Sequence, residues 1–230
     1  MTQSRALVVA AHPDDEVLGC GGTIARLAAE GWEVHILILA EGATSRSDTR
    51  DADRDAAALS GLAKSAHEAA GIMGAAGVEL EGLPDNRMDG VDLLDIVKRI
   101  EAGIDRHQPA MLLTHAASDV NIDHRRTHDA AIAAARSKPG ACVRELLFFE
   151  TLSSTEWRPP TSLPPFAPTY YVDISGTLAQ KTGALRAYAS ELEEFPHPRS
   201  IEAVESLARF RGATAGCMAA EAFEVGRIIR

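Results

Sequence analysis

The sequence predicts an α/β protein in which helices cover both faces of a mostly parallel sheet. Two observations support this prediction. Short apolar runs alternate with longer segments of helical periodicity, and the short runs contain few polar residues. Strands buried on both faces have this composition, and a β-α-β-α order is typical of parallel sheets. At 230 residues the chain is expected to form one domain, residues 1–230.

The expected elements alternate along the chain. Strands are expected at 6–11 (ALVVAA), 34–39 (VHILIL), 78–80 (VEL), 111–114 (MLLT), 146–150 (LLFFE) and 170–174 (YYVDI). Helices are expected at 17–30, 51–74, 93–107, 125–137 and 175–192, and a last helix is expected to begin at Ser200. The Pro-rich segment 158–168 is expected to be a long ordered loop, because proline suits neither a helix interior nor a central strand.

Composition narrows the classes of partner. The chain has 23 Lys plus Arg against 33 Asp plus Glu, a formal net charge of -10, which argues against general attraction to nucleic acid or anionic lipid. It shows neither a signal-peptide pattern nor an apolar run near the roughly 20 residues that span a bilayer. Cys20, Cys142 and Cys217 are too far apart for a disulfide framework or a CxxC metal site, and we expect them to be small core residues. We therefore expect a cytoplasmic protein, which could also self-associate as a homo-oligomer.

Polar segments follow the first four expected strands. They are HPDDE (12–16), EGATSR (41–46), GLPDNRMD (82–89) and HAASDVNIDH (115–124). In open α/β sheets, ligands bind beyond the carboxyl ends of the strands. We expect these four segments to meet there and to form the functional site.

Two histidines and one aspartate in these segments form a candidate metal site. His12 and Asp15 lie three residues apart on a turn that leaves a strand, and His124 ends the fourth segment. Two imidazoles and one carboxylate leave a coordination position for water, as in catalytic zinc sites. Zinc is our prediction, although Fe²⁺ and Co²⁺ accept the same ligands. The alternatives are that HPDDE is only a proline-fixed turn before an acidic helix start, and that His124 is a solvated first-turn residue.

The neighbouring residues have separate expected roles. Asp14 cannot easily bind the same ion as Asp15 but would reach the ion's water, so it is the candidate general base of a hydrolytic reaction. Asp123 could orient a ligand imidazole through the free ring N–H. Glu16 is expected to begin the first helix, where negative charge is favourable. His128, one turn after His124, is expected on the helix surface or behind a ligand rather than on the metal.

The glycine-rich run LGCGGTIA (18–25) suggests a dinucleotide-binding loop but does not fit one. Counted from Gly19, the pattern G-x-G-x-x-G requires glycine where Ile24 stands, and the acidic HPDDE lies where a pyrophosphate would approach. We expect these glycines to allow close packing between the helix and the sheet.

On these residues the sequence resembles the LmbE-like, or PIG-L, family of zinc-dependent N-deacetylases. The resemblance rests on AHPDDE (11–16) with the following LGCGGT and on DVNIDHRRTH (119–128), and it extends more loosely to EFPHPRS (194–200). It implies a Rossmann-like three-layer sandwich and a metal held by His12, Asp15 and His124. It also implies that Asp14 is the general base and that the enzyme removes acetyl from an N-acetylated amino sugar or its conjugate, releasing acetate.

One position departs from the family pattern. Sugar deacetylases of the family often have histidine three places before the last ligand, and here that position is Asn121. Asparagine can donate a hydrogen bond to a developing oxyanion but cannot change its charge near neutral pH. The proton for the leaving amine must then come from elsewhere, either from His197 or from protonated Asp14. His197 could equally be a loop histidine held in place by its flanking prolines.

Several polar residues of the same segments are candidate substrate contacts. They could bind sugar hydroxyls or a phosphate, or form ordinary loop salt bridges; they are Arg46, Asp85, Asn86, Arg87 and Arg199. Two other functions stay open at this stage. A non-haem iron oxygenase uses the same ligand set, and a sugar-binding protein could keep the fold without activity.

Overall fold

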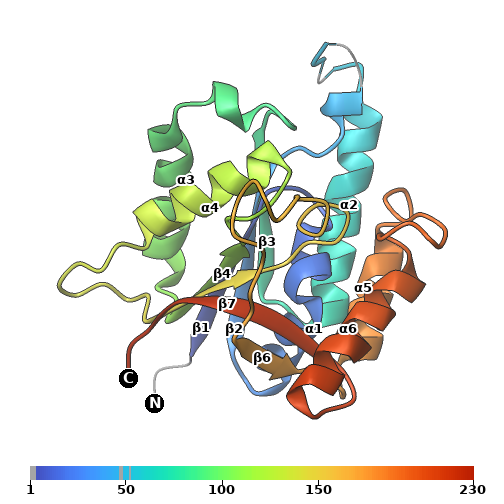
Figure 1. The fold of residues 1–230 in the computed structure, drawn as a ribbon. Coiled ribbons are helices and arrows are strands. Elements are labelled where there is room, and N and C mark those ends of the chain that lie inside the picture. The colour runs from blue at the N-terminus through green and yellow to red at the C-terminus, as the bar shows by residue number, and fades with distance from the viewer. Residues whose placement is uncertain (1–3, 47–48, 52) are drawn as a thin grey trace.

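The computed structural model describes residues 4–46, 49–51 and 53–230, which contain a seven-stranded sheet (Figure 1). Its strands lie in the order β3-β2-β1-β4-β5-β7-β6. Their bounds are β1 Arg5–Ala10, β2 Glu33–Ala40, β3 Gly77–Leu83, β4 Met111–His115, β5 Glu145–Phe149, β6 Tyr170–Asp173 and β7 Ala220–Ile228. The run from β3 to β5 is parallel, and β7 pairs antiparallel with both β5 and β6. The prediction of a mostly parallel sheet is confirmed.

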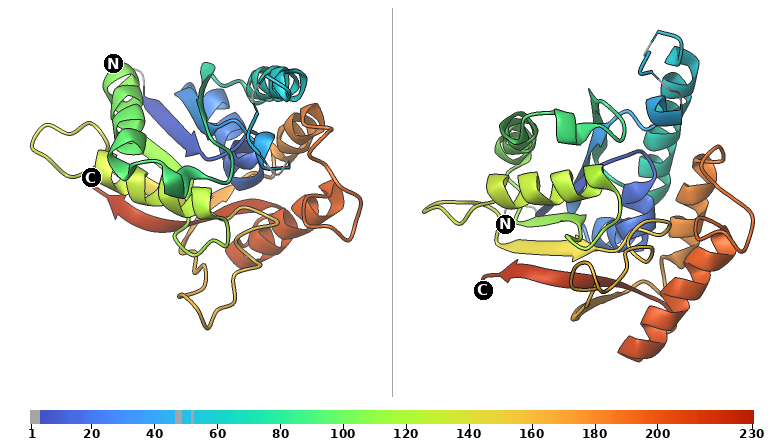
Figure 2. Two further views of the ribbon diagram at one scale, coloured as in Figure 1. Left: turned by 90° about the horizontal axis from the view of Figure 1, so that it is seen from above. Right: turned by 45° about the horizontal axis from the view of Figure 1, so that its top comes forward.

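Helices cover both faces of the sheet, as predicted (Figure 2). Their bounds are α1 Asp15–Ala29, α2 Ala56–Met73, α3 Leu93–His107, α4 Ile122–Ala134, α5 Leu178–Ala187 and α6 Ile201–Ala215, with short 3-10 turns η1 Thr44–Arg46 and η2 Met88–Gly90. Alternate residues of β1 point to opposite sides, because side chains alternate along a strand. Val8 packs with α1, α2 and α5 on one side, and Leu7 packs with α3 and α4 on the other. The molecule is thus a three-layer sandwich.

Strand β7 was not predicted from the sequence. The last helix begins as expected but ends at Ala215, where Gly216 adopts a left-handed conformation (φ 82°). The first four residues of β7 are all buried, so the strand does not show a simple alternation of apolar and polar residues. The buried carboxylate of Glu221 further obscures the pattern. The Pro-rich segment 158–168 is a loop, as predicted.

Helix α1 packs tightly against the sheet through its glycines. A Cβ atom on Gly19 would lie 2.2 Å from the Phe149 ring of β5, and one on Gly22 would lie 2.7 Å from Ile174. Both separations are far below van der Waals contact, so only glycine fits at these two positions. The expected packing role of the glycine-rich run is therefore supported. Of the cysteines, Cys20 is buried in the core, and Cys142 is partly exposed but packs against it. Cys217 is partly exposed and belongs to none of the described core clusters, so the expectation that it is a core residue was wrong.

None of the helices in the described ranges is long and apolar enough to cross a membrane.

Candidate metal centre

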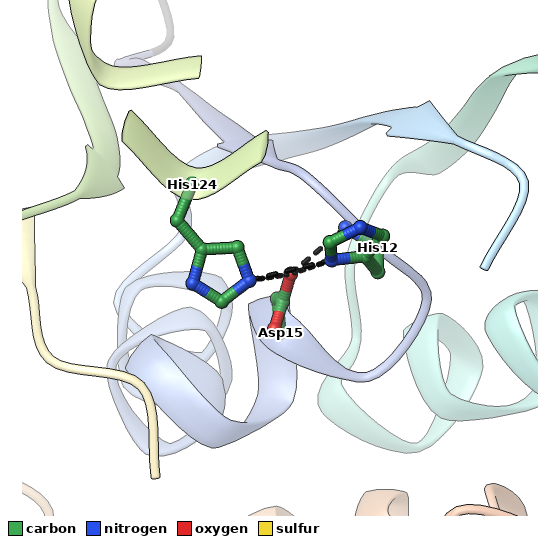
Figure 3. Close-up of side chains that lie close together, drawn as sticks. All are labelled: His12, Asp15 and His124. Carbon is green, nitrogen blue, oxygen red and sulfur yellow. Dashed lines mark hydrogen bonds and ion pairs between the residues drawn. The ribbon is translucent and has the colours of Figure 1, made fainter. Parts of the chain in front are cut away.

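Three side chains converge beyond the carboxyl ends of β1 and β4 (Figure 3). His12 comes from the turn between β1 and α1, Asp15 is the first residue of α1, and His124 comes from the first turn of α4. His12 Nδ1 lies 3.2 Å from Asp15 Oδ2 and 3.3 Å from His124 Nε2, and 3.2 Å separates His124 Nε2 from Asp15 Oδ2. The strand order reverses between β1 and β4, which is where open α/β sheets bind ligands.

The size of this triangle fits a tetrahedral zinc ion. Zinc bonds of about 2.0–2.1 Å place the ligand atoms of a regular tetrahedron ~3.3–3.4 Å apart. The three observed separations agree with that edge length to within about 0.2 Å. Three protein ligands also leave a fourth coordination position for water or substrate, as in catalytic zinc sites. The donor set therefore suits a catalytic divalent ion.

Each ligand imidazole is held from behind by a buried carboxylate. His12 Nε2 lies 3.0 Å from Asp123 Oδ2, and His124 Nδ1 lies 2.9 Å from Asp119 Oδ2. A ring N–H donated to these carboxylates leaves the lone pair of the other nitrogen for a metal. Asp123 is fixed in turn by the backbone N–H groups of Asn86 (2.6 Å) and Met88 (2.9 Å).

Two further groups of histidine and aspartate lie beside the first, but their atoms already have partners. In one group, His115 Nε2 accepts the backbone N–H of Ala11 at 2.9 Å. Its ring instead stacks on His124, with 4.0 Å between centroids. In the other group, both oxygens of Asp123 already accept backbone N–H groups, from Asn86 and Met88. The triangle of His12, Asp15 and His124 is therefore the best metal site of the three.

The neighbouring carboxylates raise the pKa of both histidines of this centre. Burial lowers the pKa of His124, but the charge of Asp15 and the hydrogen bond to Asp119 outweigh it and raise that pKa to about 9. Burial likewise opposes protonation of His12, yet hydrogen bonds to Asp123 and Asp15 raise its pKa well above the ordinary value. Protons therefore compete with a cation for both nitrogens.

Asp14 stands at the start of α1 in a strained conformation. Its φ of 103° is rare for any residue other than glycine. Its backbone N–H donates to Glu16 Oε2 (3.1 Å), and the Tyr188 hydroxyl donates to Glu16 Oε1 (2.6 Å). Burial, followed by the charge of Asp15, raises the pKa of Asp14 well above its ordinary value, although Arg199 opposes the shift. A carboxylate with a raised pKa is a stronger base at neutral pH.

The triangle forms part of the wall of a polar cavity of about 210 Å³. The cavity is lined by His12, Pro13, Asp14, Asp15, Leu18, Gly42, Ser45, Asp85, Asn86, Asn121, His124, Thr151, Leu152, Ser153, Ser154, Glu191 and Arg199. Arg199 Nη1 lies 3.8 Å from Asp14 Oδ2 and 3.6 Å from Glu191 Oε2, outside hydrogen-bond range. The lining has four carboxylates and one arginine, so its formal charge stays negative even with a divalent cation bound, and an anionic substrate is disfavoured.

Most of the residues predicted from the sequence meet at this cavity. Asp85 and Asn86 reach it from the loop after β3, and Asn121 reaches it as the N-cap of α4. The Asn121 side chain accepts the N–H of Asp123 (2.8 Å) and donates to Asn86 Oδ1 (2.9 Å). His128 is buried behind the site, where its Nδ1 lies 2.8 Å from the carbonyl oxygen of His115.

Three predicted residues are not placed at the cavity. Arg87 is exposed and is not among the described lining residues. The side chain of Arg46 lies outside the described part of the structure. His197 is half-buried and is not among the described lining residues, and its Nδ1 accepts the backbone N–H of Arg199, a lining residue, at 3.1 Å.

Several residues of the site were not found from the sequence. Asp119 is the first residue of the motif DVNIDHRRTH, but no feature of the sequence assigned it a role. Ser154 and Thr155, which donate to Asp119, come from a loop with no distinctive pattern. Tyr188 and Glu191 follow α5, far along the chain from the first motif. Only position in the fold brings these side chains to the metal centre.

A larger cavity of about 340 Å³ lies near the amino ends of β4 and β5. It is lined by the ends of α3 and α4 and by the following loop, and the described residues of its wall include no histidine. The smaller cavity at the carboxyl ends is therefore the better candidate for catalysis, because it contains the convergent donors.

A model of the PIG-L family, described as GlcNAc-PI de-N-acetylase, matches residues 7–135, more than half of the chain. The chain belongs to the PIG-L family. A 1D-myo-inositol 2-acetamido-2-deoxy-alpha-D-glucopyranoside deacetylase of Mycobacteroides abscessus is 29% identical over 84% of this chain and 83% of the relative.

Solved structures of PIG-L-like fold include enzymes of two reaction types. The 4-carboxy-2-hydroxymuconate hydratase GalB from Pseudomonas putida KT2440 has a TM-score of 0.79 and 25% identity, and the match covers 99% of both chains. The N,N'-diacetylchitobiose deacetylase of Pyrococcus horikoshii has a TM-score of 0.76 and 20% identity, over 97% of this chain and 84% of that one. The second likeness shows the fold alone.

Proposed function

We propose that this PIG-L protein is a zinc-dependent hydrolase that removes the acetyl group from an N-acetylated amino sugar or its conjugate. The observation that carries the proposal is the triangle of His12 Nδ1, Asp15 Oδ2 and His124 Nε2, whose sides match a tetrahedral zinc site. Membership of a de-N-acetylase family and the curated deacetylase relative support the same reaction. The free thiols favour a reducing compartment, so the proposal includes a cytoplasmic location.

In this proposal Asp14 moves the proton. Bound zinc would polarise the amide carbonyl and lower the pKa of water towards 7. Asp14 accepts a proton from the attacking water as its oxygen adds to the carbonyl carbon. The same carboxyl then gives the proton to the amide nitrogen, the C–N bond breaks, and acetate and the amine leave. The raised pKa of Asp14 suits both transfers.

The surrounding residues bind and orient the substrate. Asn121 has two amide N–H donors, and Asn86 Oδ1 engages one, which leaves the other for a substrate oxygen. Arg199 projects its guanidinium between Asp14 and Glu191 at separations longer than a hydrogen bond, so its N–H groups can bind sugar hydroxyls. Glu191 and Asp85 supply acceptors for the same kind of hydroxyl. A neutral sugar fits this balance of charge.

The likeness to GalB raises hydration of a carbon–carbon double bond as a second candidate. That similarity covers both chains almost completely. The substrate named for GalB carries several carboxylates, however, whereas the described lining here carries four carboxylates and one arginine. Repulsion between like charges therefore favours the deacetylase proposal.

The test is acetate release from a panel of N-acetylglucosaminides, their thiol conjugates and diacetylated sugars by zinc-loaded protein. The wild type is expected to release acetate, and Asp14→Asn is expected to keep its zinc while losing about 100- to 10,000-fold in kcat. Asp89→Asn is a control, because Asp89 is exposed and lies outside the described lining. Activity that survives chelation and His12→Ala would contradict the proposal. Loss of absorbance from an unsaturated polycarboxylate, without acetate release, would support hydration.

A further inference from the structure

His197, the residue that the sequence singled out as a proton donor, pairs with an exposed tryptophan. The His197 and Trp157 ring centroids lie 6.0 Å apart with the rings at 90°. The Trp157 side chain belongs to the loop between β5 and β6, and His197 belongs to the loop between α5 and α6 (Figure 1). Trp157 is 53% exposed, an unusual exposure for so large an apolar side chain.

Both loops also supply walls of the catalytic cavity. The Trp157 backbone N–H donates to the Ser154 carbonyl at 3.3 Å, and Ser154 lines the cavity. On the other loop, His197 Nδ1 accepts the N–H of Arg199, which also lines it. Trp157 and His197 therefore each lie within three residues, along the chain, of a residue that lines the cavity. Neither aromatic residue is itself among the described lining residues, so the pair lies outside the cavity, next to the parts of its wall that Ser154 and Arg199 form.

The cavity is too small to hold a complete sugar conjugate. Its volume of about 210 Å³ is below the ~300–1,000 Å³ of pockets that enclose drug-sized ligands. Its wall is polar and suits the acetamido group and hydroxyls of one sugar ring. Any larger group attached to that ring must then leave across the rim.

We propose that Trp157 and His197 form an aromatic platform for the aglycone of the substrate, and that this aglycone is an aryl or similarly apolar group. The inference rests on the proposed deacetylase function and names its substrate class. An apolar aglycone covers the exposed indole and gains from contact with a ring face or edge. A polyol aglycone gains less, because it loses hydration when it covers an indole. His197 is thus a specificity residue, and proton transfer stays with Asp14.

The test compares methyl and phenyl glycosides of N-acetylglucosamine with the same anomeric configuration. Zinc-loaded wild type is expected to favour the phenyl glycoside by roughly 2- to 12-fold in kcat/KM, mainly through KM. Trp157→Ala should bring that ratio close to one, mainly by raising the KM of the phenyl glycoside. Trp157→Phe should keep most of the preference. Leu94→Ala is the control, because Leu94 is 64% exposed on α3, on the other side of the sheet from α5.

A binding experiment tests the platform separately from the deacetylase activity on which the inference rests. The phenyl glycoside is titrated into the Asp14→Asn variant, and tryptophan emission measures its binding. The platform predicts a saturable change in emission that Trp157→Ala removes. A phenyl preference that is absent in the wild type, or unchanged in Trp157→Ala, would overturn the platform while leaving deacetylation standing. If neither glycoside releases acetate, the deacetylase proposal fails, and the emission titration alone decides whether the aromatic pair binds the aryl group.

Discussion

At the scale of single residues, the candidate metal centre depends on two buried aspartates that are not among its three ligands but contact the ligand imidazoles. Asp119 and Asp123 are fully buried, and each holds the far nitrogen of one ligand imidazole. They differ in their other partners. Asp123 receives backbone N–H groups from Asn86 and Met88, whereas Asp119 receives hydroxyl groups from Ser154 and Thr155. Each carboxylate thus links a ligand to a different loop.

We predict that Asp119→Asn and Asp123→Asn each weaken zinc binding by about 10- to 100-fold. An amide oxygen still accepts the ring N–H, but it lacks the charge that makes the imidazole a stronger ligand. Competition with a zinc-selective chelator measures the affinity. Asp129→Asn is the matched control on the same helix, since Asp129 is exposed. Unchanged affinity in both buried variants would show that these carboxylates have no part in metal binding.

The sequence could predict the ligands and, behind them, Asp123 as the partner of a ligand imidazole, but not the other residues that support the site. His12, Asp15 and His124 lie in compact acidic motifs at the ends of strands, so chain order and the rules of parallel sheets bring them together. Ser154 and Tyr188 have no such signal, because their role depends on how distant loops fold over the site. His197 illustrates the limit: its prolines suggested a fixed position, but only the structure shows the ring beside Trp157.

At the scale of elements, α1 is two helical segments joined by a bend at Cys20 (φ -148°, ψ 24°). A bend frees backbone groups that a regular helix would pair. The Glu221 carboxylate of β7 accepts the N–H groups of Gly22 (2.9 Å) and Thr23 (2.7 Å). Lys181 of α5 donates to the Leu18 carbonyl (2.8 Å) and pairs with Glu221 at 2.5 Å. One buried ion pair therefore satisfies both sides of the bend.

This bend also shows why β7 escaped prediction. Glu221 is a charged residue in a fully buried stretch of strand, and its partners lie on α1 and α5. A sequence pattern predicts burial from apolar side chains. It contains no signal that the carboxylate of Glu221 pairs with Lys181, 40 positions away, and accepts the backbone N–H of Gly22, 199 positions away. The helices α1 and α3 were predictable because their periodicity depends on local spacing alone.

We predict that Lys181→Met and Glu221→Gln each lower the free energy of unfolding by about 3–5 kcal/mol. Lys181→Met leaves the buried Glu221 carboxylate and the Leu18 carbonyl without their lysine partner, and Glu221→Gln leaves the buried Lys181 ammonium without its counter-charge. Urea denaturation of the zinc-free protein measures the change. The double variant is expected to lose less than the sum of the two. Arg209→Met breaks an exposed pair with Glu205 and should cost about 0–1 kcal/mol. Equal effects at the buried and exposed pairs would refute the role of the bend.

At the scale of the whole molecule, histidines gather at both ends of the sheet with different consequences. At the carboxyl ends they form the candidate metal centre. Near the amino ends, His35 of β2 stacks on His107 at the end of α3, with 3.7 Å between ring centroids. His35 Nε2 lies 3.4 Å from Glu33 Oε1, and His107 Nε2 lies 2.7 Å from Glu79 Oε1. This second cluster lies at the opposite ends of the strands from the proposed chemistry, and neither histidine is among the described lining residues of the cavity.

The His35 cluster predicts an acid-dependent loss of stability that is independent of metal. Burial, and then the charge of His107, lower the pKa of His35 despite Glu33 and Glu79. The unfolded chain therefore binds a proton more readily than the folded one, and stability rises with pH. Its contribution is complete above the ordinary histidine pKa of about 6.5 and is lost as the pH falls below that value. In zinc-free protein, His35→Gln should flatten the slope of unfolding free energy between pH 7 and 5. Equal slopes for His35→Gln and wild type would contradict this prediction.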